Sequence, residues 1–156
     1  MQIAFLGLPT DSVENIRRTG RDAYGNAVER HVSDGQVYPC RHCLEAVSAG
    51  EEYLILAHRP FLTTNPYAET GPIFLCADSC QAAPPTQNAP TILRSPQYLV
   101  RGYTADERIL YGTGSVVPTD LIAERVNTLL SDPGIAFVDV RSAANNCFQC
   151  RARRVD

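Results

Sequence analysis

Residues 53–58 read Tyr-Leu-Ile-Leu-Ala-His, and residues 72–76 read Pro-Ile-Phe-Leu-Cys. Both are short, mostly apolar runs between turn-forming residues, which is the pattern of a buried β-strand. The segment between them, 60–71, carries two prolines and a glycine and predicts an ordered loop that allows the two strands to be neighbours. This pair of strands sets the fold class, because the remaining elements must pack around a sheet.

Further strands are predicted on both sides of this pair, at residues 3–8, 97–101, 107–111, 135–141 and 147–150. Residues 24–35 are polar and turn-rich, and residues 82–96 contain four prolines, which predicts a long connection that could serve as a linker or lid. Strands outnumber helices without regular alternation, so we expect an α+β fold in a single domain, residues 1–156. Its sheet should be mixed or mainly antiparallel, with two or three short helices.

Two of these helices are visible in the sequence. The first, residues 11–18, begins with Asp11 as its N-cap, has Glu14 three residues later in a capping-box pattern, and is closed by a glycine. The second, residues 120–130, follows Thr119 as its cap and places its apolar residues on one face. The second helix is therefore expected to pack through this apolar face.

Composition and charge exclude several classes of function. The formal net charge is −3 and both signs are mixed along the chain, so no broad positive field recruits nucleic acid or an anionic membrane. No apolar run approaches the roughly 20 residues of a membrane helix, and the first residues lack a secretory pattern, so we expect a cytoplasmic protein. All 14 basic residues are arginine, which excludes Schiff-base and phosphate-loop lysines. The basic tail Arg151, Arg153 and Arg154 is interpreted as a solvated chain end.

Six cysteines form three closely spaced pairs, Cys40/Cys43, Cys76/Cys80 and Cys147/Cys150. Two thiolates separated by two or three residues can hold one side of a tetrahedral zinc ion, with zinc–sulfur distances of about 2.3 Å. A structural zinc needs two pairs to converge, and two predicted strands between the first two pairs could bring them together. The third pair is an alternative partner for the first. The long separation of the pairs, and the absence of a glycine after Cys43 or Cys150, weigh against zinc.

Three other interpretations of the cysteines stay open. They could be small buried side chains of the core, or structural disulfides, which a reducing compartment disfavours. The third is redox chemistry, in which Cys40 is a nucleophilic thiolate, Cys43 is the resolving thiol and His42 lowers the pKa of Cys40. This arrangement is loosely similar to a thioredoxin site, although the strand and helix alternation of that fold is missing. Outside a redox site, His42 is expected at the surface.

A second group of residues is a candidate ligand site. His58 leaves a predicted strand, and Arg101, Tyr103, Tyr111 and Arg141 occupy predicted strand ends. Arginine can bind a carboxylate or phosphate through two parallel hydrogen bonds, so these side chains could line a pocket for a small anion. The alternative is that they form surface salt bridges and half-buried tyrosines.

Five stretches of the sequence, taken in order, carry a resemblance to a known family. They are Pro-Cys-Arg-His-Cys-Leu at 39–44, Ala-His-Arg-Pro-Phe at 57–61, Pro-Tyr-Ala-Glu-Thr-Gly-Pro-Ile-Phe at 66–74, Arg-Gly-Tyr at 101–103 and Val-Arg-Ser-Ala-Ala-Asn-Asn-Cys at 140–147. Over nearly its full length the chain resembles an uncharacterised bacterial family, domain of unknown function 1203. The resemblance implies no activity.

The chain departs from this family at two cysteines. Cys76 stands where a histidine is common, and Cys150 stands where an apolar residue is common. Because histidine also binds metals, the resemblance favours the pairing of Cys40 and Cys43 with Cys76 and Cys80, and it puts the pair containing Cys150 in doubt.

Together these observations predict a small cytoplasmic protein without catalytic activity, stabilised by a structural zinc ion on Cys40, Cys43, Cys76 and Cys80. It would act by binding a small ligand or a protein partner, and neither nucleic acid nor a membrane is expected among its partners. The alternative is a thiol–disulfide redox enzyme that uses the Cys40/Cys43 pair.

Overall fold

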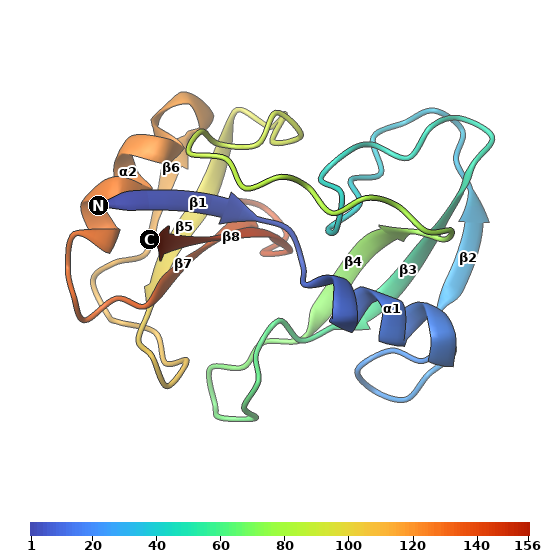
Figure 1. The fold of residues 1–156 in the computed structure, drawn as a ribbon, viewed down its shortest axis with the longest axis horizontal. Coiled ribbons are helices and arrows are strands. Elements are labelled where there is room, and N and C mark those ends of the chain that lie inside the picture. The colour runs from blue at the N-terminus through green and yellow to red at the C-terminus, as the bar shows by residue number, and fades with distance from the viewer. The chain divides into compact units, whose positions relative to one another are not determined.

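The computed structural model describes residues 1–156, which form eight β-strands, two α-helices and one 3₁₀ helix (Figure 1). In chain order the elements are β1 (Gln2–Leu6), α1 (Thr10–Thr19), β2 (Glu29–Val32), β3 (Glu52–His58), β4 (Gly71–Cys76), β5 (Gln97–Tyr103), β6 (Ser115–Pro118), η1 (Thr119–Leu121), α2 (Ile122–Leu130), β7 (Phe137–Ser142) and β8 (Phe148–Val155). The predicted α+β class is confirmed. The predicted long connection at 82–96 is also confirmed, because it holds no helix or strand.

The strands form two sheets instead of one, and all neighbouring strands in them are antiparallel. The strand orders are β1-β8-β7-β5-β6 and β2-β3-β4. The chain divides into two compact units. Unit 1 comprises Met1–Leu6, Phe61–Glu69 and Pro84–Asp156, and unit 2 comprises Gly7–Pro60 and Thr70–Ala83. The assignment of residues 1–156 to one domain stays a prediction.

Unit 2 is built on the two strands that the sequence predicted most directly. β3 lies between β2 and β4, with Leu54 opposite Leu75 and Leu56 opposite Ile73. All four side chains are buried, and each contributes about 1.5–3 kcal/mol of transfer free energy. α1 belongs to the same unit and buries Val13 and Ile16.

The first helix is confirmed, but its predicted capping box is wrong. Asp11 lies inside the first turn, Pro9 occupies the N-cap position, and no side chain caps this end. Proline suits a helix start because its missing N–H would have had no partner there. At the other end Gly20 adopts a φ of 63°, and its N–H binds the carbonyl of Ile16, as expected for a glycine that ends a helix.

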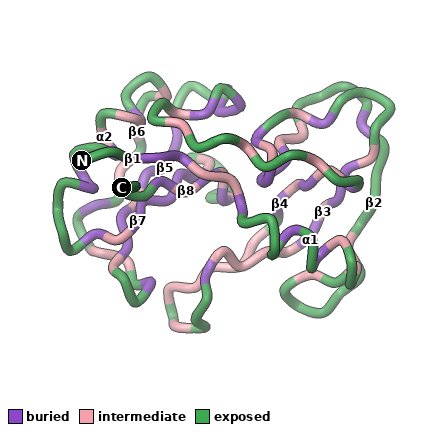
Figure 2. Tube along the Cα trace, viewed as in Figure 1, coloured by how far each residue is buried: buried purple, intermediate pink, exposed green.

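β2 falls within residues 24–35, where the sequence predicted only turns. All four of its residues are exposed, and Figure 2 shows the strand green along its length. It forms the edge of the sheet and pairs with β3 alone. Because neither face is buried, Glu-Arg-His-Val lacks the alternation that would have predicted a strand.

In unit 1, β7 is central and five of its six residues are buried, which Figure 2 shows in purple. Side chains alternate along a strand, so Phe137, Asp139 and Arg141 share one face. On that face Phe137 stacks on Tyr103 with ring centroids 5.0 Å apart, and Phe61 packs against both rings. The segment Phe61–Glu69 therefore lies over this face of the five-stranded sheet.

Asp139 is fully buried and forms a two-bond ion pair with Arg151. Arg151 donates from Nε to Oδ1 at 2.6 Å and from Nη2 to Oδ2 at 2.9 Å. The Arg151 guanidinium also lies 3.8 Å from the centroid of the Phe137 ring. The prediction of a solvated chain end at Arg151, Arg153 and Arg154 is wrong for Arg151, which is partly buried, whereas Arg153 and Arg154 are exposed; all three belong to β8, which pairs with β1.

The second helix is confirmed as η1 followed by α2, but its predicted cap is wrong. Thr119 donates its hydroxyl to the carbonyl of Ser95, and no side chain caps either helix. α2 buries Ile122, Val126, Leu129 and Leu130 and packs against β5 and β7. No helix in the structure combines the length and the apolar character needed to cross a membrane.

The predicted strand at 107–111 is wrong, because Glu107 turns the chain. Its φ is 62°, which is incompatible with an extended strand, and its side chain is buried. The carboxylate accepts hydrogen bonds from the amides of Leu62 and Thr63, at 2.9 and 2.8 Å. Within unit 1, Glu107 therefore anchors the segment Phe61–Glu69 to the turn that follows β5.

Candidate metal centre

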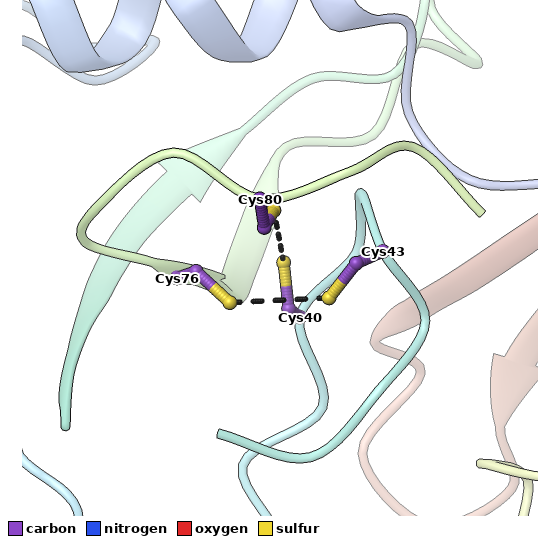
Figure 3. A group of neighbouring side chains, drawn as sticks. All are labelled: Cys40, Cys43, Cys76 and Cys80. Carbon is purple, nitrogen blue, oxygen red and sulfur yellow. Dashed lines mark hydrogen bonds between the residues drawn. The ribbon is translucent and has the colours of Figure 1, made fainter. Parts of the chain in front are cut away.

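Four of the six cysteines converge in unit 2. Cys40 and Cys43 lie on the turn before β3, Cys76 ends β4, and Cys80 lies on the loop that follows β4, as Figure 3 shows. The four Sγ atoms all lie within 4.8 Å of one another. The structure therefore brings together the set that the sequence predicted as metal ligands.

The spacing of these sulfur atoms fits a tetrahedral metal shell. A regular tetrahedron with metal–sulfur distances of about 2.3 Å has sulfur–sulfur edges of about 3.8 Å. The Sγ atoms of Cys40 and Cys80 are 3.8 Å apart, and those of Cys43 and Cys76 are 3.9 Å apart (Figure 3). These are two opposite edges of the tetrahedron, so one ion at the centre could reach all four sulfur atoms.

The turn that holds Cys40 and Cys43 has the backbone of a metal knuckle. The amide of Leu44 donates to the carbonyl of Cys40 at 2.9 Å, and the amide of Cys40 donates to the carbonyl of Glu45 at 2.9 Å. Leu44 adopts a φ of 56°, in the left-handed region where glycine is usual. The missing glycine therefore does not exclude a knuckle, because Leu44 takes the required conformation and is itself buried.

The knuckle is packed tightly against the chain on both sides. Leu8 donates its amide to the carbonyl of Arg41 at 2.7 Å, and Ala83 donates its amide to the carbonyl of His42 at 3.1 Å. A Cβ atom on Gly7 would lie 2.5 Å from the His42 carbonyl oxygen, closer than any real contact. The approach of the N-terminal segment to the knuckle therefore requires a glycine at this position.

The thiols are electrostatically coupled. Hydrogen bonds from the Cys43 and Cys76 side chains, together with the amides of the same residues, lower the pKa of Cys40. The bond to Cys40 in turn raises the pKa of Cys43 to about 12 and also raises the pKa of Cys76. Without a metal, the cluster therefore concentrates its negative charge on Cys40 and keeps the other two thiols protonated.

Cys80 receives two further donors. Arg17 on α1 donates from Nη2 to the Sγ atom at 3.2 Å; burial lowers the pKa of Arg17, but its hydrogen bonds, that to Cys80 foremost, outweigh this effect and raise it. His42 Nδ1 lies 3.1 Å from the same sulfur atom, and its Nε2 lies 2.9 Å from the hydroxyl of Thr10. Burial lowers the pKa of His42, so a neutral ring with its hydrogen on Nδ1 satisfies both contacts.

His42 is therefore placed differently from its predicted positions. It is 1% exposed, so the expectation of a surface side chain is wrong. Its ring contacts Cys80, whereas the redox interpretation had it acting on Cys40. An imidazole that orients a sulfur ligand is a common partner just outside a metal shell.

The third cysteine pair belongs to unit 1 and lies outside the cluster. Cys150 is buried in β8 opposite Val140, and Cys147 lies in the turn between β7 and β8. The structure thus groups Cys76 and Cys80, and not this pair, with the knuckle. None of the four clustered cysteines forms a disulfide.

The predicted anion-binding residues are partly brought together in unit 1. Arg101 and Arg141 both bind Glu69, at 2.9 and 3.1 Å, and Arg101 donates from Nε to the Tyr103 hydroxyl at 2.9 Å. Tyr111 is exposed, and its hydroxyl is 2.7 Å from that of Tyr67. His58 ends β3 in unit 2.

Sequence reasoning did not assign a metal-site role to Arg17 or Thr10, nor an arginine-bridging role to Glu69. Arg17 lies 59 residues before Cys76, whose carbonyl it also binds, and Glu69 lies 32 residues before Arg101. Contacts between residues so far apart in the sequence produce no short-range spacing pattern from which they could be predicted. The one signal was that Arg17 falls one helical turn after Val13, on the side of α1 that is buried.

Comparison with known proteins gives one match. The sequence pattern of the family described as "Protein of unknown function (DUF1203)" matches residues 37–154, so the chain belongs to this family, as its motifs indicated. The matched region contains all four clustered cysteines, whereas α1, which supplies Arg17 and Thr10, precedes it. No curated protein and no solved structure matches the chain.

Proposed function

We propose that this DUF1203 protein is a non-catalytic binding protein whose unit 2 is held together by a structural zinc ion on Cys40, Cys43, Cys76 and Cys80. The observation that supports this proposal is the convergence of four sulfur atoms at the spacing of a tetrahedral shell. Four thiolates in this arrangement are the typical ligands of zinc, which prefers sulfur and has no redox chemistry of its own.

The ligand set favours a structural role over a catalytic one. Catalytic zinc sites keep a coordination position for water or substrate, whereas structural sites fill all four positions with side chains. Here four cysteines, from the knuckle, from β4 and from the loop after it, provide a complete set. A bound ion would therefore link three segments of unit 2.

Because unit 2 is small, such a link would contribute to its folding stability. Gly7–Pro60 and Thr70–Ala83 form a unit below the size of about 70–80 residues at which one apolar core becomes sufficient for stability. Metal binding adds directly to folding stability, because the unfolded chain has no preformed site. Arg17 offsets part of the negative charge that four thiolates bring to the site.

A thiol–disulfide enzyme is the second candidate function, and the lowered pKa of Cys40 is the observation that favours it. Accessibility argues against it, because Cys40 is 0% exposed and an attacking thiolate must reach the sulfur atom of its partner. The raised pKa of Cys43 also makes it a poor resolving thiol at neutral pH. We propose a cytoplasmic location, in which reduced cysteines persist.

The proposal is tested by metal content. Elemental mass spectrometry on untagged protein should find about one zinc per chain, the stoichiometry of a four-cysteine site, and a thiol count after denaturation should find all six cysteines reduced. Cys76→Ser and Cys80→Ser should lose the zinc. Cys147→Ser is the matched control and should retain it, because Cys147 lies outside the cluster.

Two results would contradict the zinc proposal. One is wild-type protein that remains metal-free after expression and refolding with zinc. The other is equal zinc content in Cys80→Ser and Cys147→Ser. Catalytic turnover in a disulfide-exchange assay, abolished by Cys40→Ser, would instead establish the redox enzyme.

A further inference from the structure

Unit 1 contains a buried arginine that uses only one of its three side-chain nitrogen atoms in polar contacts. Arg141 on β7 is 3% exposed. Its Nη1 donates to the carbonyl of Asn146 at 2.9 Å and lies 3.1 Å from Glu69. Its Nε and Nη2 are both buried and have no partner. Buried donors of a charged group are costly to leave unpaired, so an unfilled pair of this kind indicates a missing acceptor.

These two atoms form the edge of the guanidinium that recognises carboxylates. Nε–H and Nη2–H point in the same direction and match the two oxygens of a carboxylate. The same edge of Arg151 binds both oxygens of Asp139, and the same edge of Arg101 binds Tyr103 and Glu69. In Arg59 and Arg125, Nε is the one side-chain atom that is both buried and without a partner. Arg141 therefore differs from these arginines in having the whole edge available.

The surroundings of Arg141 have a net positive charge. Two arginines, Arg101 and Arg141, share the single carboxylate of Glu69, which leaves one positive charge without a counterion within this group. Burial raises the pKa of Tyr103, and the charges of Arg141 and Arg101 oppose that rise, which places the tyrosine hydroxyl within their field. That hydroxyl accepts from Arg101, so its own hydrogen can be donated to a further acceptor.

We propose that unit 1 binds a small carboxylate, whose two oxygens accept from Nε and Nη2 of Arg141 and one of whose oxygens also accepts from the Tyr103 hydroxyl. A carboxylate fits better than a phosphate because one negative charge neutralises the group, whereas a dianion would reverse its sign. This inference supplies the ligand class for the proposed binding role, and it does not depend on zinc in unit 2.

The test uses the full chain, supplemented with zinc, and three probes, acetate, propionate and inorganic phosphate, at constant ionic strength with chloride as the reference. Two-dimensional nuclear magnetic resonance of the arginine Nε–H groups reports directly on the predicted contact. Acetate or propionate should shift the Arg141 Nε–H signal in a saturable way, because that hydrogen gains a charged acceptor. Phosphate should shift it less at the same concentration.

Variants separate the site from general arginine binding. Arg141→Lys keeps the charge but loses the two-donor edge, and it should abolish saturable binding. Arg108→Lys is the matched control, since Arg108 is an exposed arginine of unit 1, and it should bind as the wild type does. Tyr103→Phe removes one hydroxyl and should weaken binding by about tenfold, the equivalent of one hydrogen bond to a charged group.

The inference is overturned if no carboxylate shifts the Arg141 Nε–H signal of wild-type protein, or if Arg141→Lys and Arg108→Lys bind equally well. The wild-type spectrum and Tyr103→Phe give the answer even if Arg141→Lys fails to fold. Zinc content is measured on the same sample. Carboxylate binding by protein that takes up no zinc would contradict the zinc proposal alone. Zinc-loaded protein that binds no carboxylate would contradict this inference alone.

Discussion

Replacing Arg17 tests whether residues just outside the sulfur cluster determine its affinity for metal. Arg17 donates from Nη2 to Cys80 Sγ at 3.2 Å and from Nε and Nη2 to the Cys76 carbonyl at 3.2 and 3.1 Å. Its side chain is only 9% exposed, so water cannot readily replace these bonds. The adjacent Arg18 is exposed, and the one side-chain hydrogen bond it makes is to Asn15. The pair Arg17→Gln and Arg18→Gln is therefore a matched comparison within one helix.

The expected magnitude follows from the bonds that are lost. Partners just outside a metal shell typically change metal affinity by about 10–100-fold when they are removed. Hydrogen bonds to charged groups contribute about 1.5–3 kcal/mol each, so Arg17→Gln should cost about 3 kcal/mol of the stability of unit 2. The ion pair with Glu14 adds little, because that carboxylate is half exposed. Arg18→Gln should stay within about 0.5 kcal/mol of the wild type.

The assay is competition for zinc against a coloured chelator, followed by urea unfolding of the zinc-loaded proteins. Arg17→Gln should release its zinc at a clearly lower chelator concentration than Arg18→Gln. Arg17→Lys, which keeps the charge but cannot reach both acceptors, should lie between them. If Arg17→Gln and Arg18→Gln release zinc at the same chelator concentration, the assignment of Arg17 as a partner of the metal site is refuted.

Two further predictions concern anchoring contacts. Burial raises the pKa of Glu107, but hydrogen bonds from two loop amides outweigh it and lower the pKa. The stabilisation is therefore complete above the unfolded pKa of about 4.3 and is lost as pH falls through the folded value. Hydrogen exchange should show the Leu62 amide losing protection in acid, and Glu107→Gln should show the same loss at neutral pH. If the Leu62 and Thr63 amides both stay protected in Glu107→Gln, a contact other than the Glu107 carboxylate holds this loop. Gly7→Ala should destabilise zinc-loaded protein by about 1–3 kcal/mol in urea, because its Cβ would overlap the His42 carbonyl, whereas Gly71→Ala has open space and should unfold near the wild-type midpoint.

The sequence predicted those features that depend on local pattern. β3 and β4 were recognised because their apolar runs are buried, and α2 because its apolar residues share one face. The short spacing within each cysteine pair indicated a shared ion, and the family resemblance favoured Cys76 and Cys80 over Cys147 and Cys150 as the second pair. The two helices predicted from caps at Asp11 and Thr119 are present, but neither residue caps its helix.

Features that depend on contacts between distant segments were not predictable. Residues 107–111 have the composition of a strand, but Glu107 leaves the extended conformation to bind amides 44 and 45 residues away. β2 is defined only by its pairing with β3, since its own residues are exposed. The knuckle formed without glycine because burial of Leu44 accompanies its left-handed backbone.

The pairing of β1 with β8 has a consequence for synthesis of the chain on the ribosome. β1 is made before every other strand described here, but its partner β8 is completed only at residue 155. Pairing of strands so far apart in sequence is slow, because the intervening chain must first be closed into a loop. The residues of unit 2, by contrast, have all been made once residue 83 emerges. The cysteine cluster is thus complete while the sheet of unit 1 is still unfinished, so the proposed zinc ion could bind during translation, before β8 is available to pair with β1.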